Sequence, residues 1–310
     1  MKDEIIKLND AKDKIKSCLG IIEKVQRPAV QHSFKHDIIN LLDKGYCVFS
    51  LDTFKWKPYQ NVFQNVLSMR VDNPTLSTVY ARGHIYQFGG DFTPTRYIRL
   101  SLADKSCYDG KIVGVNGGYY ISSCFDGDKY IYLVGGIMDY KRLNRVDRFN
   151  IDTHQFEHVC QLQTPLVNDK GGLHCHKNNK LYMVNKLNDS GYQVKTFDLL
   201  THAQVFLLEV TSNGSQYQND CFDGIDNIYI KTSSAFHRIT LSSKQKTILA
   251  KCPASNNNLL YDPTLGRIFS IGGKNDNYQY SVQNDKWVLI KDNGRMKTRV
   301  APFCLLSSYN

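Results

Sequence analysis

The side chains best placed to do chemistry are His174, Cys175 and His176, which follow one another directly. Successive side chains of a β-strand alternate between two faces, so both imidazoles would share one face and the thiol would occupy the other. A metal ion there would need further ligands from another strand, and the nine cysteines contain no C-x2-4-C pair of the structural zinc type. We therefore interpret the cluster as an ordinary sheet position, and we expect no metal site and no cofactor.

Catalysis requires groups that converge, such as paired carboxylates, a nucleophile beside its base, or a set of metal ligands. The acidic residues of the loop-like stretches, among them Asp139 and Asp276, are scattered among basic and neutral residues. No motif marks a tyrosine, a histidine and a cysteine that would converge on copper, as one class of oxidase needs. The sequence therefore predicts that the protein is not an enzyme.

Composition narrows the class further. The chain has 310 residues, of which 42% are hydrophobic, so it can bury a sizeable core. Its longest apolar stretch, around Tyr130 to Val134, is far shorter than the roughly 20 residues that cross a bilayer. The opening segment is charged and contains no secretory h-region, so we expect a cytoplasmic protein whose cysteines remain thiols. The net charge of +10 is spread along the chain and forms no arm for nucleic acid.

An aromatic or apolar residue is followed seven positions later by a second bulky residue at regular intervals. The clearest pairs are Phe49 with Trp56, Phe149 with Phe156, and Tyr280 with Trp287. Degenerate pairs lie between them: Leu100 with Cys107, Phe197 with Gln204, and Ile239 with Lys246. The aliphatic residue two positions after each first member falls at 51, 102, 151, 199, 241 and 282, a spacing of 41 to 51 residues. The sequence thus contains six repeated units.

A strand that ends in two glycines precedes several of these pairs, at Gly89-Gly90, Gly135-Gly136 and Gly272-Gly273. Further upstream, Asp126-Gly127 and Asp223-Gly224 have the composition of hairpin turns. Each unit is therefore predicted to run strand, turn, strand, loop, strand, turn, strand. A sheet of about 45 residues cannot bury both faces alone, so the units are expected to pack around an axis as blades.

The two glycines and the aromatic pair resemble the kelch repeat, in which a di-glycine ends the second strand and a Tyr-x6-Trp pair links the third and fourth. The resemblance covers roughly residues 45 to 310. It implies an all-β fold, a kelch-like β-propeller of six four-stranded blades, and we assign residues 31–310 to it. Cys124, Cys175, Cys221 and Cys304 would then lie on or beside innermost strands, where small thiols suit the tight packing.

Ring closure is expected to use both ends of this domain. Residues 46–59 correspond to the third and fourth strands of a blade, and the stretch from 299 to 306 corresponds to an inner strand. The two would share one blade and so remove an open sheet edge. Residues 36–43 would supply the missing second strand, or that blade would be three-stranded.

Residues 1–30 form a separate amino-terminal unit in this interpretation. Residues 3–26 contain no proline and repeat an apolar side chain at alternating steps of three and four, which predicts an amphipathic α-helix. The helix would either self-associate as a short coiled coil or dock on the propeller. A helix followed by a propeller is similar to the carboxy-terminal part of proteins that join a B-box zinc finger and a coiled coil to a kelch-like ring, although the finger has no counterpart here.

In a propeller, the loops from strand two to three and from strand four to the next blade gather at one mouth of the ring, where binding sites are usually built. Arg and Tyr are the residue types most often found as interface hot spots. Our candidate partner-binding residues are Arg96, Tyr140, Lys141, Arg142, Arg145, Tyr192 and Lys274.

These loops predict a non-catalytic protein-interaction or scaffold module. The alternatives are binding of an acidic ligand, RNA or a phosphorylated partner, through the basic loop around Arg142, and a propeller enzyme such as a glycosidase or an oxidase. Insertion into a membrane is not expected, and a protein partner is favoured over nucleic acid.

Overall fold

The structure is a computed structural model that describes residues 37–42, 45–60, 77–90, 92–163, 172–176, 178–187, 191–211, 217–254, 257–273, 276–294 and 303–306. All regular secondary structure in these residues is β-strand. They include no helix of the length and hydrophobicity needed to cross a membrane. The predicted helix at residues 3–26, the 30/31 domain boundary and Lys274 lie outside the described residues.

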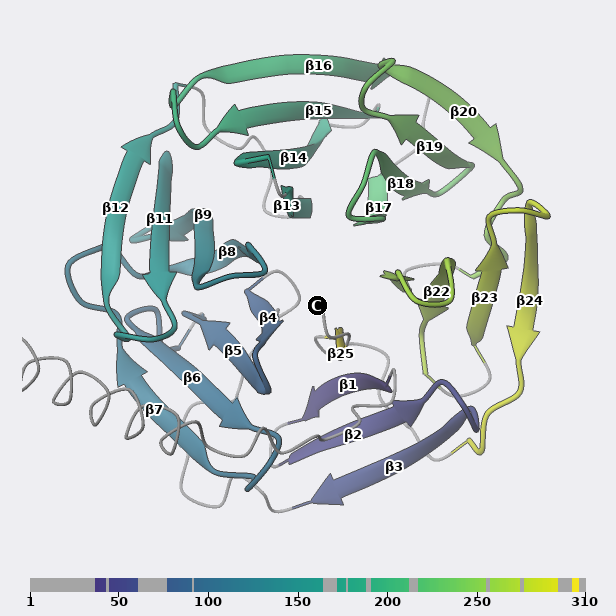
Figure 1. The fold of residues 1–310 in the computed structure, drawn as a ribbon, viewed down its shortest axis with the longest axis horizontal. Coiled ribbons are helices and arrows are strands. Elements are labelled where there is room, and N and C mark those ends of the chain that lie inside the picture. The colour runs from purple at the N-terminus through teal and green to yellow at the C-terminus, as the bar shows by residue number, and fades with distance from the viewer. Residues whose placement is uncertain are drawn as a thin grey trace, which may run out of the picture. The chain divides into compact units, whose positions relative to one another are not determined.

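The strands form six antiparallel sheets, named here blades A to F, which follow one another around a common axis (Figure 1). Blade A contains β25 (Phe303–Leu306), β1 (Asp37–Leu42), β2 (Gly45–Ser50) and β3 (Lys55–Gln60). Blade B contains β4 (Thr78–Ala81), β5 (His84–Phe88), β6 (Arg96–Ser101) and β7 (Cys107–Lys111). Blade C contains β8 (Tyr119–Phe125), β9 (Tyr130–Met138), β11 (Arg145–Asn150) and β12 (Phe156–Gln161), with the two-residue β10 (Lys141–Arg142) paired on β9.

Blades D, E and F repeat the same order. Blade D contains β13 (Gly172–His176), β14 (Lys180–Leu187), β15 (Gly191–Asp198) and β16 (Gln204–Thr211). Blade E contains β17 (Tyr217–Phe222), β18 (Asn227–Thr232), β19 (Phe236–Thr240) and β20 (Gln245–Leu249). Blade F contains β21 (Asn258–Asp262), β22 (Arg267–Ile271), β23 (Asn277–Ser281) and β24 (Lys286–Ile290). The predicted all-β propeller of six four-stranded blades is confirmed.

Blade A closes the ring as the sequence predicts. β25 pairs antiparallel with β1 from Asn40 opposite Phe303 to Asp37 opposite Leu306, and β1 pairs in turn with β2. The carboxy-terminal strand is therefore the innermost strand of a blade whose other three strands come from the opposite end of the domain. Of the two alternatives for this blade, the structure has the complete one, with four strands.

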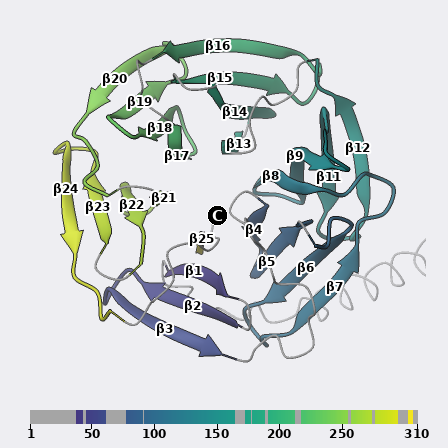
Figure 2. The ribbon, with the colours of Figure 1, turned by 180° about the vertical axis from the view of Figure 1, so that it is seen from behind.

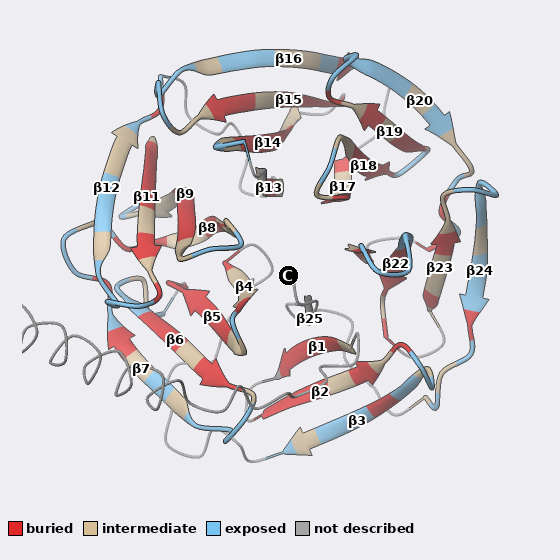
Figure 3. Ribbon diagram, viewed as in Figure 1, coloured by how far each residue is buried: buried red, intermediate tan, exposed pale blue. Residues whose placement is uncertain are grey.

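The aromatic pairs occupy the interfaces between blades. The rings of Phe49 and Trp56 face each other across β2 and β3 with centroids 4.7 Å apart, and those of Phe149 and Phe156 do so across β11 and β12 at 4.8 Å. Each pair packs on the preceding blade, as Phe149 does on Phe88 of β5 at 5.5 Å. Buried residues concentrate on the two middle strands of each blade, and most residues of the outermost strands are exposed or partly buried (Figure 3).

The di-glycine of blade B ties the blade to the loop that follows it. Gly89 has a φ of +67°, and a Cβ on this residue would overlap the carbonyl oxygen of Gly118. The N–H of Gly90 donates to that same oxygen at 3.1 Å, and the N–H of Gly118 donates to Pro94 O at 2.7 Å. Glycine is needed here because the loops at residues 89–95 and 112–118 approach so closely.

Four cysteines lie on innermost strands, as expected: Cys124, Cys175, Cys221 and Cys304, on β8, β13, β17 and β25. Cys124 and Cys175 are joined in a disulfide with their Cα atoms 5.9 Å apart. The expectation that every cysteine is a thiol is therefore wrong for this pair. The disulfide links the innermost strands of blades C and D, which the sequence separation of 51 residues did not suggest.

Candidate partner-binding site

A polar pocket, here the rim pocket, opens on the ring face formed by the loops from strand two to three and from strand four to the next blade. It has a volume of about 490 Å³. Three segments build it: the β7–β8 loop, the β10–β11 connection, and facing positions on β11 and β12. The lining residues are Gly114, Val115, Asn116, Arg142, Leu143, Asn144, Arg145, Asp147, His158 and Gln161.

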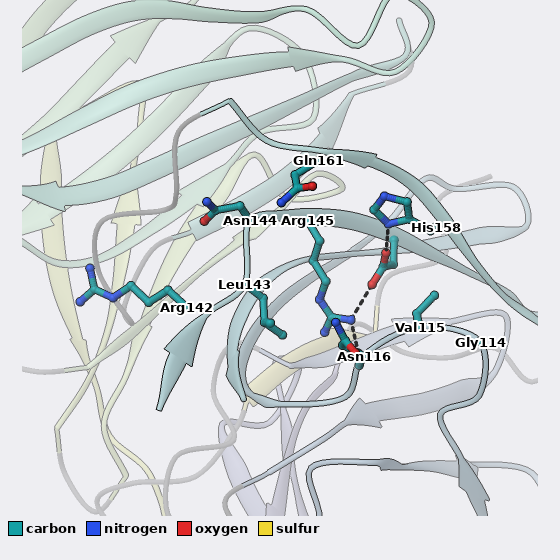
Figure 4. Close-up of a pocket in the computed structure, with 10 residues that line it drawn as sticks. Gly114, Val115, Asn116, Arg142, Leu143, Asn144, Arg145, His158 and Gln161 are labelled. Carbon is teal, nitrogen blue, oxygen red and sulfur yellow. Dashed lines mark hydrogen bonds and ion pairs between the residues drawn. The ribbon is translucent and has the colours of Figure 1, made fainter. Parts of the chain in front are cut away.

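A buried ion pair holds the pocket together (Figure 4). The guanidinium of Arg145 lies 2.5 Å from Asp147 Oδ2, and both side chains are almost fully buried. Arg145 also donates to three backbone carbonyl oxygens, those of Asn116, Gly117 at 3.1 Å and Gly135 at 3.2 Å. Arg145, on β11, thus holds the β7–β8 loop, which connects blades B and C, against β9 and β11.

Burial lowers the pKa of the Arg145 guanidinium, and the charge of Asp147 opposes that change. The guanidinium keeps its proton at physiological pH, because arginine starts from so high a pKa. Its positive charge is already balanced by Asp147 and its donors are engaged by the protein. Arg145 is therefore a positioning residue of the pocket and adds little free positive charge to it.

The second oxygen of the same carboxylate orients a histidine. Nδ1 of His158 lies 2.8 Å from Asp147 Oδ1, a geometry in which Nδ1–H donates and Nε2 is left as the other ring nitrogen. His158 is on β12 and largely exposed, whereas Asp147 is 1% exposed. The pocket can therefore present a fixed imidazole, together with the amides of Asn144 and Gln161, to a polar ligand group.

The pocket does not contain the usual parts of a hydrolytic site. A carboxylate and an imidazole in contact recur in nucleophilic enzymes, but those sites also need a nucleophile beside the histidine. None of the residues that line the rim pocket is Ser, Thr, Cys or Lys. Within the described part of the chain, no group of three His, Cys, Asp or Glu side chains is placed to bind a metal. The arrangement suits recognition.

The predicted site residues divide into exposed and buried groups. Tyr140, in the turn before β10, is 97% exposed, and Lys141 and Arg142 on β10 are also exposed. Arg96 begins β6, on the same face, and forms an ion pair with Asp109 at 2.5 Å. Tyr192 was expected in a loop but lies on β15, fully buried, with its hydroxyl 3.0 Å from His237 Nδ1. The structure therefore brings Arg142 and Arg145 together in one pocket and leaves Tyr192 in the core.

Asp147 and His158 were not among the predicted site residues, although the sequence contains a signal for both. Phe149 and Phe156 are cross-strand partners. In an antiparallel pair, the residue two before Phe149, which is Asp147, therefore faces the residue two after Phe156, which is His158. The two are directly opposite in the register of β11 and β12. His174 of the His174-Cys175-His176 cluster donates from Nε2 to Asp220 Oδ2 on β17 of the next blade at 2.5 Å, which fits a structural role.

Comparisons with known proteins agree with this fold. The Kelch motif family model matches residues 127–159, which run from the β8–β9 turn into β12. A kelch repeat-containing protein of Dictyostelium discoideum is 26% identical over 178 residues. The chain is thus similar to kelch-repeat proteins in one matched repeat. The matched kelch repeat includes Arg142, Arg145, Asp147 and His158, so the rim pocket is largely built on it.

The likenesses cover part of one relative and the whole fold of another protein. The alignment covers 50% of this chain and 26% of the Dictyostelium protein, so the chain spans only about a quarter of that relative's length. A chain in the crystal structure of a nidogen/laminin complex superposes with a TM-score of 0.62, covering 88% of this chain and 98% of that one. Its sequence identity is 10%, so this likeness concerns the fold alone. Kelch propellers are generally interaction modules rather than enzymes.

Proposed function

We propose that this propeller is a protein-interaction module that binds its partner at the ring face containing the rim pocket. The observation that carries the proposal is the set of hydrogen bonds from Arg145 to two loop carbonyls and one strand carbonyl. Rigid loops lose little conformational entropy on binding, so a pre-organised rim favours affinity. The same face presents exposed aromatic and basic side chains that a partner could cover.

Those side chains suit an acidic protein surface with apolar patches. Tyr140 is almost fully exposed, and Phe92, in the β5–β6 loop on the same face, is 69% exposed. Large exposed aromatics beside cationic Lys141 and Arg142 have the composition of an interface centre. Since Arg145 is neutralised by Asp147, the cationic surface here is smaller than the sequence suggested. That reduction favours a protein partner over RNA.

The test compares partners captured by the intact chain with those captured by a Tyr140→Ala, Arg142→Glu double variant, using affinity purification and quantitative mass spectrometry. A Lys246→Glu variant, on the exposed outer strand β20, controls for a change in charge elsewhere. Partners should be lost with the double variant and kept with the control, all at matched melting temperature. Capture of the same partners by all three forms would contradict the proposal.

We propose that residues 3–26 mediate self-association, which light scattering on the intact chain and on a chain lacking residues 1–30 would test. A cytoplasmic location is proposed from the sequence alone. Imaging of the tagged full-length protein would test it.

A further inference from the structure

The rim pocket has an amide-rich lining whose hydrogen-bonding capacity is unused. Within the residues that the structure describes, the side chains of Asn116, Asn144 and Gln161 make no hydrogen bond. Oδ1 of Asn144 is shielded from solvent without a partner, which costs free energy. A half turn of this amide exchanges Oδ1 with Nδ2, so the side chain can offer either an acceptor or a donor to the pocket. Amides that lack partners in a concave site indicate a polar ligand.

The backbone on both sides of the pocket holds these amides in place. Asn144 directly precedes β11 and Gln161 ends β12, and the carbonyl oxygen of Asn144 accepts the N–H of Leu162 at 2.9 Å. Asn116 comes from the β7–β8 loop, which joins blades B and C and is held by Arg145. These two blades are neighbours in both views of the ring (Figures 1 and 2). Because the amides start from ordered backbone, ordering them on binding costs little free energy.

The two buried charges of the pocket balance each other. Asp147 is the single acidic lining residue, and its two oxygens are occupied by Arg145 at 2.5 Å and by His158 at 2.8 Å. A cationic side chain of a partner would therefore meet no available carboxylate. Arg142 is exposed, and Figure 4 shows its guanidinium extending away from Arg145 and His158. The interior of the pocket consequently favours a neutral ligand group over an anion or a cation.

The other lining groups narrow the neutral ligand to an amide. Because Nδ1–H of His158 donates to Asp147, Nε2 of the neutral ring is an acceptor, and with the free amides it requires a ligand that both donates and accepts hydrogen bonds. None of the lining residues is Phe, Tyr or Trp, so the pocket has no aromatic platform for a sugar ring. Leu143 and Val115 provide apolar contact for a short aliphatic stem. The side chains of Asn and Gln combine such a stem with two N–H donors and a carbonyl acceptor.

We propose that the rim pocket binds a carboxamide side chain, Asn or Gln, that the protein partner inserts at this face. The N–H groups of the ligand donate to Nε2 of His158 and to an amide oxygen of the lining, and its carbonyl oxygen accepts from a lining amide N–H. Its methylene groups pack against Leu143. The proposal rests on the proposed function, since it names the chemical group of the partner that enters the pocket.

The probes are nine-residue peptides of varied flanking sequence, made in sets that differ only in the central residue, which is Asn, Gln, Glu, Lys or Leu. Binding to the full chain is measured by fluorescence anisotropy. We expect the tightest binders to have a central Asn or Gln. Replacing that residue by Glu, Lys or Leu should weaken them by at least about tenfold, because hydrogen-bonding groups of the pocket are then left without partners.

Three results of this measurement would overturn the proposal. The Glu set could bind as tightly as the Asn and Gln sets, which would show that the pocket accepts an anion. No set could bind at all. Methyl glucoside could displace peptides that show no preference for Asn or Gln, which would assign the pocket to a sugar.

Variants locate the carboxamide in the pocket. Asn144→Leu and Gln161→Leu should each reduce the preference for central Gln over central Leu from about tenfold to about threefold, since each removes one hydrogen-bonding partner. The matched control is Asn284→Leu, because Asn284 in the β23–β24 turn is exposed and does not line the pocket. A ratio of two affinities is unaffected by a fraction of unfolded protein, so a destabilised variant still reports. An unchanged ratio in both pocket variants, or an equal reduction in the control, would contradict the assignment.

Failure of this proposal is distinguishable from failure of the proposed function. If the Tyr140→Ala, Arg142→Glu variant loses the partner while central Gln and Glu peptides bind alike, the rim face remains the partner site and the carboxamide is the wrong ligand group. If the peptides prefer Gln but the Asn144→Leu, Gln161→Leu double variant keeps the captured partner, the pocket binds carboxamides and its assignment to the partner is wrong.

Discussion

The carboxylate of Asp147 binds His158 through one oxygen and Arg145 through the other, at 2.8 and 2.5 Å. One buried acid on β11 therefore connects the outer strand of its blade to a guanidinium that holds the preceding loop. Without Arg145, that acid would keep only the hydrogen bond from His158. The order of the rim pocket thus depends on a pair of charges, each of which requires the other.

Removing one member of that pair should cost more than removing both. We expect Arg145→Met to lower the free energy of unfolding by about 3 kcal/mol, since it leaves a buried carboxylate and three carbonyl oxygens without their donor. The double variant Arg145→Met, Asp147→Leu should be less destabilised than the sum of the single variants. Urea denaturation of the four proteins measures this coupling, and additive losses would show that the two side chains do not act together.

The disulfide between Cys124 and Cys175 should stabilise the contact between blades C and D. Cross-linking residues 51 positions apart restricts the unfolded chain, and we expect the Cys124→Ala, Cys175→Ala variant to lose about 3 kcal/mol. Urea denaturation with and without reductant gives the comparison: reductant should destabilise the native protein and leave the variant unchanged. If alkylation without reductant modifies as many cysteines as alkylation after reduction, the bond is not formed.

A buried lysine gives the propeller a measurable pH dependence. Lys231 on β18 is 1% exposed, its Nζ donates to Asn257 O at 2.7 Å, and burial lowers its pKa to about 8. The charges of Cys252 and Asp276 act in the opposite direction. Between pH 8 and the ordinary lysine pKa of about 10.4, the unfolded chain holds a proton that the folded chain has released. Stability from this group should therefore rise with pH across that window.

The measurement compares wild type with Lys231→Met, because buried tyrosines and thiols with raised pKa values oppose the trend above pH 9. The stability difference between the two proteins should move by about 2 kcal/mol in favour of wild type from pH 7.5 to pH 10. A difference that stays constant over this range would mean that Lys231 keeps its proton in the folded state.

Much of the fold could be predicted because its signals are local. Phe149 and Phe156 recur at a fixed spacing because cross-strand partners on neighbouring strands must face each other, and Asp126 with Gly127 forms the tight turn that their composition predicts. The closing blade A could also be predicted, since the incomplete unit at the amino-terminal end of the domain needs a strand from the carboxy-terminal end.

The rest depends on relations between blades that a single unit does not encode. Cys175 reaches Cys124 only because the innermost strands of two different blades lie side by side. The 51-residue separation of the two cysteines in the sequence does not indicate that their Cα atoms are close. Arg145 was expected to be exposed because arginine usually is. Its burial follows from the counter-ion two residues along the same strand, Asp147, which returns to the same face.

Closure of the ring is a fourth test. Deleting residues 299–310 removes β25, which exposes the edge of β1 in blade A and opens the circle of blades. We expect the melting temperature of the whole propeller to fall in one cooperative step, because each blade buries its faces only against its neighbours. A melting curve identical to that of the full chain would show that pairing of β25 with β1 does not stabilise the ring.

Salt dependence distinguishes the partner classes at the rim pocket. Lys141 and Arg142 are the exposed cations of its loop, and Tyr140 beside them contributes apolar area. We expect affinity for the captured protein partner to fall only a few-fold between 50 and 200 mM salt, because ion pairs at an exposed surface contribute little and are screened. Tyr140→Ala should weaken binding by about tenfold at both salt concentrations.

Binding of RNA would behave differently. If basic side chains neutralised many RNA phosphates, affinity would fall by orders of magnitude over this range of salt concentration, and Tyr140→Ala would have little effect. Titration of the purified partner and of a mixed-sequence RNA against the two proteins separates these outcomes, and a steep salt dependence with an unaltered Tyr140→Ala affinity would favour the acidic-ligand alternative.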